Sequence, residues 1–431
     1  MNSQQPKKGR QAKAKPAEPK LARNLPVTGT YTLLDSSEAA ARLGISKATL
    51  YAYVSRGLLS ASNDPSDPRV RRYSSFEVEL LQRRKQGGRQ REQQARAALN
   101  EGLPVLDTAL SCVREGEPIY RGRPALAMVE ADCSAEDVAR HLWQFAPELD
   151  PFASPAPTLG ASWQMLRAQL PLGPNSRPLA LFATALSDLH GPAWLPDGEA
   201  LALACAAHLR ALVASFLNRP PSHEALHTQF RRAWRLPASS DAALRRALVL
   251  VADHEMNMVS FSARCLASVE ASLGAAMLAA MCNLTATFNG GACAQVEALW
   301  DEIAAAPDMK AALRRRLDRG EGLPGFNHLS YPGGDPRARR LLEECALLAT
   351  GEAPSLQQTL PQTLAPAVAR LTGWKPSLDF GLVALRRALG APADAALSLQ
   401  MAGRGIGVMA HILEQKRSGQ RLWVRARYVG P

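Results

Sequence analysis

The chain has 431 residues, of which 46% are apolar and 21% are charged, and its formal net charge is +12. This length exceeds the roughly 100–150 residues of one typical domain, so at least two folded units are expected. The seven cysteines are scattered without a C-x-x-C pair. That pattern argues against a disulfide framework or a metal site and favours reduced thiols in the cytoplasm.

The basic character is concentrated in the first 100 residues, which hold 19 lysines and arginines against 8 acidic residues. The rest of the chain is nearly balanced, with 32 against 31. Such a charge distribution predicts that a polyanion such as nucleic acid binds the N-terminal part. A solvated basic tail that only aids solubility is the alternative.

Residues 1–30 are rich in Lys, Pro, Ala and Gln. This composition buries too little apolar surface to fold, so we expect a disordered basic arm without the apolar run of a secretory signal. Farther along, the most apolar stretches are interrupted by His208 and Arg210 or are too short to cross a bilayer. No membrane-spanning segment is therefore expected.

A helix-turn-helix pattern begins at Tyr31. Ser36 or Ser37 is predicted to cap a short helix, Gly44 to make the turn, and Ser46 to cap a second helix that runs to about Arg56. A turn-rich stretch, the basic run 69–72 and a further helical segment from near Ser75 follow.

Residues 31–90 resemble the MerR-type winged helix-turn-helix domain. The resemblance implies contacts to DNA phosphates or base edges from five side chains: Lys47, Thr49, Arg56, Arg71 and Arg72. Short helix-turn-helix segments also occur in modules that bind proteins, so a protein partner is the alternative.

Residues 100–431 are predicted to form one long unit. A short β-ribbon is expected within residues 103–129, and helical segments should follow nearly to the end, because Ala and Leu dominate from residue 200 onward. Four segments of this unit carry side chains suited to chemistry: Asp253–Arg264 with His254, Gly322–Arg337 with His328, Lys375–Phe380 with Asp379, and Gly403–Gln415 with Arg404.

Each segment also has an ordinary explanation. His254 fits a satisfied core histidine, and the Gly/Pro-punctuated segment around His328 fits a surface turn. Asp379 lies between Leu378 and Phe380. Such apolar neighbours favour a raised pKa and a role as a base, but an aspartate here also suits a helix cap.

Taken in this order, the four segments resemble the citrate synthase family, and Tyr120–Gly122 fits an early motif of that family. The resemblance covers roughly residues 100–431. It implies an all-α homodimer whose large and small domains close over the substrates, with the small domain at roughly 300–390. The implied reaction condenses acetyl-CoA, or another acyl-CoA, with oxaloacetate to give citrate and CoA, without a separate cofactor.

The resemblance also implies roles for single residues. Asp379 would be the base that removes a proton from the acyl group, and His328 would act as an acid at the oxaloacetate carbonyl. His254, Arg337 and Arg404 would hold oxaloacetate, since guanidinium groups match carboxylates in pairs of hydrogen bonds.

The sequence departs from the family at several of these places. Asn289 replaces the histidine that donates to the thioester oxygen, and Trp423-Val424 stands where an Arg-Pro is expected, with Arg425 as a possible substitute for binding substrate. Smaller changes are Met258-Val259 in place of Ala-Ser, and Asn327 in place of a loop glycine. Losing a donor of this kind typically costs about a hundredfold to a thousandfold in rate, although an asparagine amide can still donate.

Three hypotheses follow. The first is a condensing enzyme, slowed by these changes, that carries a DNA-binding module. The second is an inactive enzyme domain that senses a metabolite and regulates transcription, and the third is a pair of modules that serve assembly alone. We favour the first, because the base, the acid and three predicted substrate ligands are all present.

Overall fold

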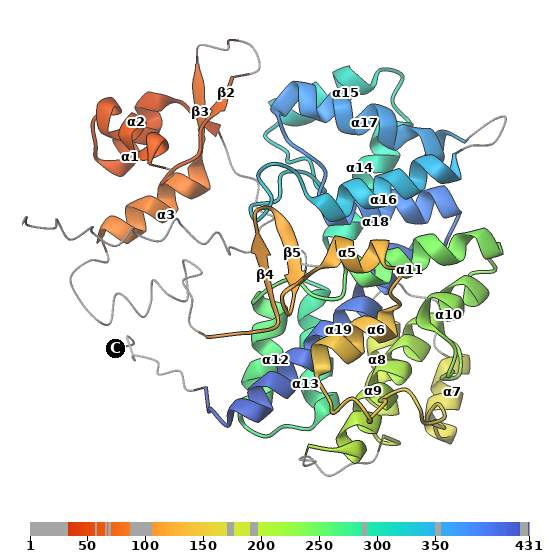
Figure 1. Ribbon diagram of the computed structural model, residues 1–431. Coiled ribbons are helices and arrows are strands. Elements are labelled where there is room, and N and C mark those ends of the chain that lie inside the picture. The colour runs from red at the N-terminus through yellow and green to blue at the C-terminus, as the bar shows by residue number, and fades with distance from the viewer. Residues whose placement is uncertain are drawn as a thin grey trace, which may run out of the picture.

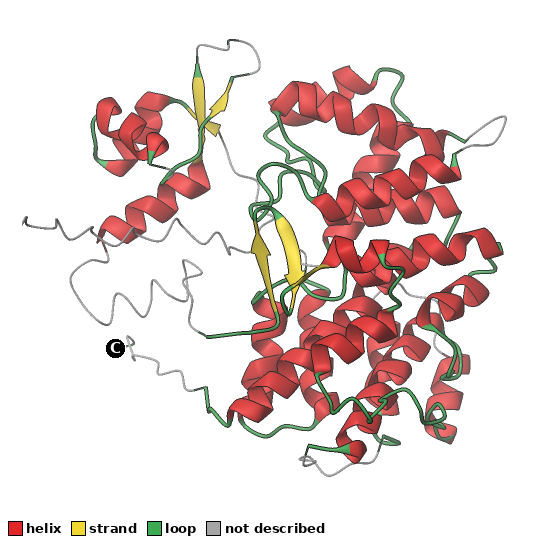
Figure 2. Cartoon of the chain, viewed as in Figure 1, coloured by secondary structure: helices red, strands yellow, loops and turns green. Residues whose placement is uncertain are grey.

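The computed structural model describes residues 33–56, 58–64, 67, 70–86, 106–169, 176–189, 197–286, 291–349, 355–422 and 430. The predicted disordered arm at residues 1–30 lies outside these ranges. Within them the protein is mostly helical, with two small three-stranded sheets (Figures 1 and 2). The prediction of a largely helical fold is therefore confirmed.

The N-terminal unit combines three helices with a small antiparallel sheet. The helices are α1 (Ser36–Leu43), α2 (Lys47–Ser55) and α3 (Ser75–Gln86), and the strands are β1 (Leu33–Leu34), β2 (Ser62–Asn63) and β3 (Arg71–Ser74). The strand order is β1-β3-β2, so the central strand is the one that carries part of the basic run.

Asp35, not Ser36 or Ser37, caps α1. Its carboxylate accepts from the backbone N–H groups of Ser37 (2.6 Å) and Glu38 (2.8 Å), and Glu38 accepts from the Asp35 N–H at 2.9 Å. The predicted cap was wrong by one or two residues. Asp35 is the last residue with an extended backbone before the helix, and its reciprocal pairing with Glu38 forms a capping box.

The turn and the second helix of the N-terminal unit follow the prediction. Gly44 adopts the left-handed conformation at φ 60°, and Ser46 caps α2 by accepting from the Thr49 N–H at 3.2 Å. A small core holds the unit together, and its most buried members include Leu50, Tyr73 and Val78. This core is a cluster separate from that of the remaining chain.

The second unit begins with the predicted β-ribbon. Strands β4 (Ser111–Arg114), β5 (Glu117–Tyr120) and β6 (Arg123–Pro124) pair antiparallel in chain order. The helices of its first half are α5 (Ala125–Glu130), α6 (Ala135–Trp143), α7 (Ala161–Gln169), α8 (Ser176–Ala185), α9 (Glu199–Leu217), α10 (Leu226–Ala233) and α11 (Asp241–Leu250).

The helices of the second half complete the body. They are α12 (Met258–Ser268), α13 (Leu273–Leu284), α14 (Ala292–Ala304), α15 (Met309–Asp318), α16 (Pro336–Leu348), α17 (Leu356–Thr372), α18 (Leu378–Leu389) and α19 (Ala395–Ser418). Figure 1 shows α14 to α18 gathered above the ribbon, while α19 runs among the helices below it.

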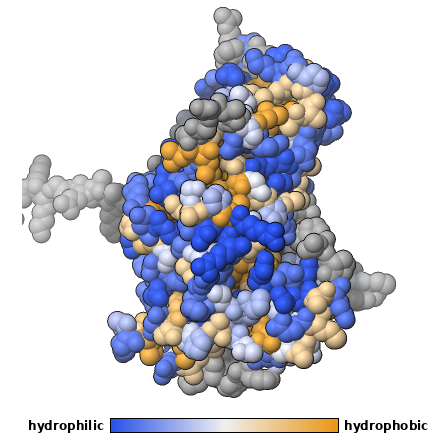
Figure 3. All heavy atoms as spheres, turned by 90° about the vertical axis from the view of Figure 1, so that its right-hand side faces the viewer, coloured by the Kyte–Doolittle hydropathy of each residue, from blue (hydrophilic) through white to orange (hydrophobic). Residues whose placement is uncertain are grey.

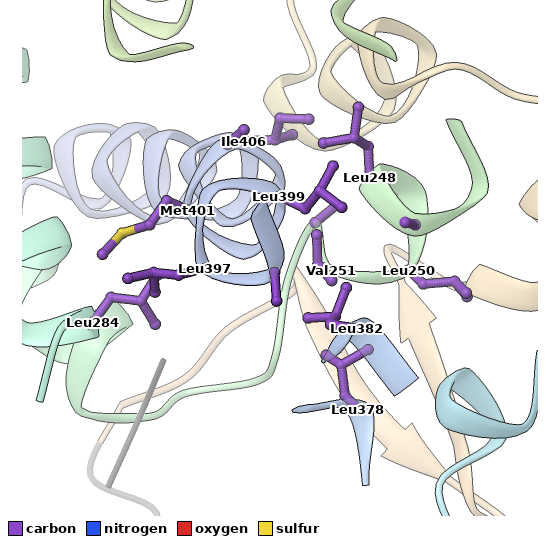
Figure 4. Packing of buried hydrophobic residues seen from close by; sticks show 14 of the residues in the cluster. Leu248, Leu250, Val251, Leu284, Leu378, Leu382, Leu397, Leu399, Met401 and Ile406 are labelled. Carbon is purple, nitrogen blue, oxygen red and sulfur yellow. The ribbon is translucent and has the colours of Figure 1, made fainter. Parts of the chain in front are cut away.

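Helix α19 is the longest described helix, and most of it is buried. Figure 4 shows its Leu399 lying near Leu248 and Val251 at the end of α11. Gly407 allows the close approach: its N–H donates to the Ala252 carbonyl at 3.0 Å, and a Cβ there would collide with that carbonyl oxygen. The chain from α11 to α12 is thereby held directly against α19.

Helix α9 is long and apolar enough to cross a membrane by length and composition, but 78% of its apolar window is buried inside the fold. Core helices of globular domains pass the same test. On the face shown in Figure 3, hydrophilic residues predominate and apolar residues form smaller groups between them. The apolar composition of α9 is therefore explained by its place in the core of the protein.

Candidate active site

Three of the four predicted segments meet where helices begin, and the fourth, around Arg404, lies in the middle of α19. His254 lies in the connection between α11 and α12, and His328 lies in the loop between α15 and α16. Arg337 and Asp379 occupy the first turns of α16 and α18. Each of these residues lies in a connection or in the first helical turn after one, so side chains from distant parts of the sequence can meet.

His254 is neutral and has a defined tautomer. The Nη1 group of Arg337 lies 3.2 Å from Nδ1 of His254. Burial and then the charge of Arg337 hold the pKa of His254 well below its usual range. Because a guanidinium can only donate, Nδ1 must accept and the imidazole proton resides on Nε2.

His328, which lies next to His254, is also neutral and also carries its proton on Nε2. The two imidazole rings meet edge to face with their centroids 5.0 Å apart. Burial lowers the pKa of His328 to about 4. The backbone N–H of Ser330 donates to Nδ1 at 3.2 Å. His328 is therefore neutral at physiological pH and keeps an Nε2–H donor, as a proton donor to a carbonyl oxygen requires.

The loop of His328 is hydrogen-bonded to the segment that leads to Asp379. The Asn327 N–H donates to the Lys375 carbonyl at 2.8 Å, and the Ser377 N–H donates to the Gly325 carbonyl at 2.7 Å. Asn327 has φ 63°, a left-handed conformation that asparagine tolerates better than most residues. This conformation explains why asparagine can replace the glycine of the family pattern.

Asp379 has the environment of a base. Burial raises the pKa of its carboxyl group, while Arg337 lowers it and Asp335 raises it. The residue is half-buried, and Ser377 rather than Asp379 occupies the N-cap position of α18. The alternative role as a helix cap is therefore wrong, and the predicted rise in pKa is present.

Asp335 and Arg337 form a buried ion pair that links the beginnings of α16 and α18. Asp335 accepts from Nη2 of Arg337 at 2.8 Å and from the backbone N–H of Leu378 at 3.1 Å. Both side chains are about 1% exposed or less. The Arg337 guanidinium also lies over the Tyr331 ring, 4.8 Å from its centroid. Arg337 thus contacts His254 directly, and it is linked through Tyr331 to the loop of His328 and through Asp335 to the start of α18.

Arg404 is buried in a second network, around Asp253, which directly precedes His254. Its Nη1 pairs with Asp253, and its Nη2 donates to Ser260 Oγ at 2.7 Å and to Asn257 Oδ1 at 3.1 Å. His411 Nε2 lies 3.2 Å from the other Asp253 oxygen. Burial opposes ionisation of Asp253, but Arg404 and His411 together lower the pKa of its carboxyl group.

The structure therefore brings His254, His328, Arg337 and Asp379 into one connected framework, with Arg404 one step away. Both arginines are already paired with a carboxylate of the chain. Their predicted contacts to oxaloacetate stay predictions. Asn289, Arg425 and the Trp423-Val424 pair lie outside the described residues.

Sequence reasoning missed several residues that support this framework. Asp335 directly precedes the Pro-Arg that starts α16, and Asp253 directly precedes His254. Both are acidic residues close in sequence to a predicted ligand. A search of the sequence for acids that could pair with the two arginines would have found them. Gln400 and Cys293, which lie beside Asp379, gave no such signal.

The predicted DNA-contacting residues lie on one small unit. Lys47, Arg56 and Arg71 are exposed, while Thr49 is half-buried and its hydroxyl lies 2.9 Å from Ser46 Oγ. Arg72 is bonded to Asp64 at 2.5 Å, so its charge is partly neutralised.

Tyr51, which the sequence reasoning did not single out, is 47% exposed at the middle of α2. It lies one turn after Lys47 and one turn before Ser55, so the three share an exposed face.

Both units match models of known protein families. A family model described as "Citrate synthase, C-terminal domain" matches residues 98–427, and a helix-turn-helix domain model matches residues 33–86. In solved structures the fold is similar to citrate synthase from Thermotoga maritima, with a TM-score of 0.62, 20% identity, and coverage of 77% of this chain and 94% of that one. It is also similar to the Thermoplasma acidophilum enzyme in ternary complex with carboxymethyl coenzyme A and oxaloacetate, with a TM-score of 0.64, 20% identity, and coverage of 76% and 94%.

Among curated proteins, the chain is 35% identical over 189 residues to "Putative citrate synthase 2" of Mycobacterium tuberculosis. That match covers 42% of this chain and 50% of the relative, so the chain spans about half the length of such relatives. A citrate synthase of Mycolicibacterium smegmatis is 28% identical over 357 residues, which cover 76% of this chain and 94% of the relative. Since the family model spans most of the sequence, the chain belongs to the citrate synthase family, with a helix-turn-helix domain preceding the family domain.

Proposed function

We propose that the chain is a citrate-synthase-like acyltransferase that condenses acetyl-CoA, or another acyl-CoA, with oxaloacetate to give citrate and CoA. The observation that carries the proposal is the Asp379 carboxyl group. Its pKa is raised by burial, and the segment that carries it is bonded through Asp335 and Arg337 to the neutral His254, whose ring contacts the ring of the neutral His328. A carboxylate whose pKa is raised toward neutrality is a better base near pH 7 than an exposed one.

The two histidines suit the other half of the reaction. The carbonyl carbon of oxaloacetate must accept a carbanion, and negative charge then develops on its oxygen. A neutral imidazole N–H can donate to that oxygen and transfer its proton, as proposed for His328, while His254 would hold the substrate through its own Nε2–H. Neutral donors avoid the cost of burying two further cations beside Arg337.

Asn289 is expected to weaken the reaction without preventing it. An amide N–H donates a hydrogen bond to the thioester oxygen less effectively than the histidine of the family pattern. Complete loss of such a donor costs about a hundredfold to a thousandfold in rate, so its replacement by a weaker donor should cost less than that. The variant Asn289→His should therefore be faster than the natural chain.

The test is the release of free thiol from acetyl-CoA in the presence of oxaloacetate, with propionyl-CoA as a second substrate. Asp379→Asn should lower kcat by about 10²–10⁴, and wild-type kcat/KM should fall as the pH drops through the raised pKa of Asp379. Asp394→Asn is the matched control, because burial also raises the pKa of that half-buried carboxyl group, at the start of α19.

The competing hypothesis is an inactive, metabolite-sensing domain. A natural chain that releases no thiol with either substrate, beside an Asn289→His variant that does, would contradict the proposal and favour sensing. The presence of the base, the acid and the buried arginine framework supports retained chemistry.

We further propose that the N-terminal unit binds DNA. Support comes from the helix-turn-helix match and from the exposed cations Lys47, Arg56 and Arg71. Binding to a 30-base-pair duplex, followed by fluorescence anisotropy, should weaken steeply with salt. Removing one phosphate contact, as in Lys47→Ala or Arg71→Ala, should reduce the slope of log affinity against log salt by about 1. Arg319→Ala, an exposed cation of the other unit, should leave it unchanged.

We also propose a homodimer in the cytoplasm. The dimer follows from the family resemblance, and sedimentation of the full chain tests it. The proposed location follows from the scattered cysteines of the sequence, which form no C-x-x-C pair and favour a reducing compartment.

A further inference from the structure

The two oxygens of Asp379 have different surroundings. Oδ1 accepts a hydrogen bond from Nε2 of Gln400 at 3.3 Å, and the Cys293 thiol points to the same oxygen at 3.8 Å. Oδ2 is approached by Ser377 Oγ at 3.4 Å. Oδ1 is therefore contacted by two side chains from other helices, and Oδ2 by one long contact from its own segment.

The two side chains contact each other. The Cys293 thiol also lies 3.7 Å from Oε1 of Gln400, and its single proton is shared between this oxygen and Oδ1 of Asp379. A bond to Oε1 favours the amide orientation in which the NH₂ group faces the carboxylate. Cys293 belongs to the first turn of α14 and is 3% exposed, while Gln400 belongs to α19. Helices α14, α18 and α19 thus meet at a single carboxylate oxygen.

We propose that Gln400 and Cys293 are positioning residues that hold Oδ1 of Asp379, so that Oδ2 is the oxygen that takes the proton from the acyl-CoA. This inference rests on the proposed condensing activity. The step is a proton transfer: the C–H bond beside the thioester carbonyl breaks, an O–H bond forms on Oδ2, and the electron pair enters the enolate. No oxidant or reductant takes part.

The charges around Asp379 set the direction of the expected effect. Arg337 and Asp335 face it from the start of α16, with opposite influences, and Glu297 of α14 lies near Cys293. The Gln400 amide donates to the ionised carboxylate and so favours the charged form. Removing that donor should raise the pKa of Asp379 further and loosen its side chain.

The test measures the titration of Asp379 directly. In protein labelled with ¹³C at the aspartate carboxyl carbons, the resonance absent from Asp379→Asn reports this group whether or not the protein turns over substrate. In Gln400→Met its midpoint should rise by about one pH unit, and in Cys293→Ala by less, since a thiol is a weak donor. Cys293→Ser keeps a donor and should restore most of the wild-type value.

Matched controls separate this effect from general loosening. Gln415→Met alters a second glutamine of α19, which is buried, and Cys345→Ala alters another buried thiol. Neither should move the midpoint. In thiol-release assays Gln400→Met should lower kcat by about tenfold with little change in KM, as loss of alignment predicts.

A midpoint in Gln400→Met that moves no more than in Gln415→Met would overturn the inference even if the enzyme is active. A shifted midpoint in a protein that releases no thiol would instead support the arrangement around Oδ1 and contradict the proposed activity.

Discussion

The ion pair between Asp335 and Arg337 offers the sharpest test of how this site is built. Asp335 accepts four hydrogen bonds. Its Oδ1 accepts from the backbone N and the Nε of Arg337, both at 3.0 Å, and its Oδ2 accepts from Nη2 of Arg337 at 2.8 Å and from the Leu378 N–H at 3.1 Å. Asp335→Asn keeps the shape but leaves one acceptor oxygen and a buried, unpaired guanidinium.

Breaking a buried pair in this way costs about 3–5 kcal/mol in the free energy of unfolding. Loss of the helix cap alone cannot account for such a value, because asparagine caps helices about as well as aspartate. Asp308→Asn is the matched control: Asp308 is exposed and caps α15 by accepting from the Lys310 and Ala311 N–H groups. That change should cost at most about 0.5 kcal/mol.

The pH dependence has a definite sign. Burial opposes ionisation of Asp335, but Arg337 lowers the pKa of its carboxyl group below the unfolded value of 3.8. Its stabilising contribution is therefore fully present above that value and is lost as the pH falls through the lower folded-state pKa. The difference between wild type and Asp335→Asn should be the same at pH 5 and pH 7.5 and shrink only below pH 3.8.

The assay is urea unfolding of the full chain, followed by circular dichroism at 222 nm. If Asp335→Asn is no less stable than Asp308→Asn at pH 7.5, the charge of Asp335 does not stabilise Arg337 as argued. The framework of the site would then depend on packing alone.

Three further predictions test the packing of the two units. Gly407→Ala should destabilise the protein by about 3 kcal/mol in the same unfolding assay, because the added methyl group would collide with the Ala252 carbonyl. Asn327→Val should cost about 1–2 kcal/mol, since a β-branched residue does not tolerate its φ of 63°, whereas Asn327→Gly should be close to neutral. Leu50→Ala should destabilise only the N-terminal unit, by about 2–5 kcal/mol, and leave thiol release unchanged, because that unit has its own core.

Local signals along the sequence determined much of this protein. The Ala- and Leu-rich composition indicated a helical body, and the serine and glycine positions around Gly44 and Ser46 indicated the helix-turn-helix. These features depend on residues within a few positions of one another, so a single sequence shows them. The family motifs predicted the residues of the site, because the order of these motifs along the chain can be recognised from the sequence.

Only the tertiary structure decided how those residues are used. Arg337 and Arg404 looked alike in the sequence as free cations for a substrate, but each is paired with an acid that the fold brings to it. The neutral state of His328 follows from burial, and the contacts to Oδ1 of Asp379 come from Cys293 of α14 and Gln400 of α19. Protonation and orientation depend on neighbours distant in sequence and on exclusion from water, and both exist only once the helices have packed together.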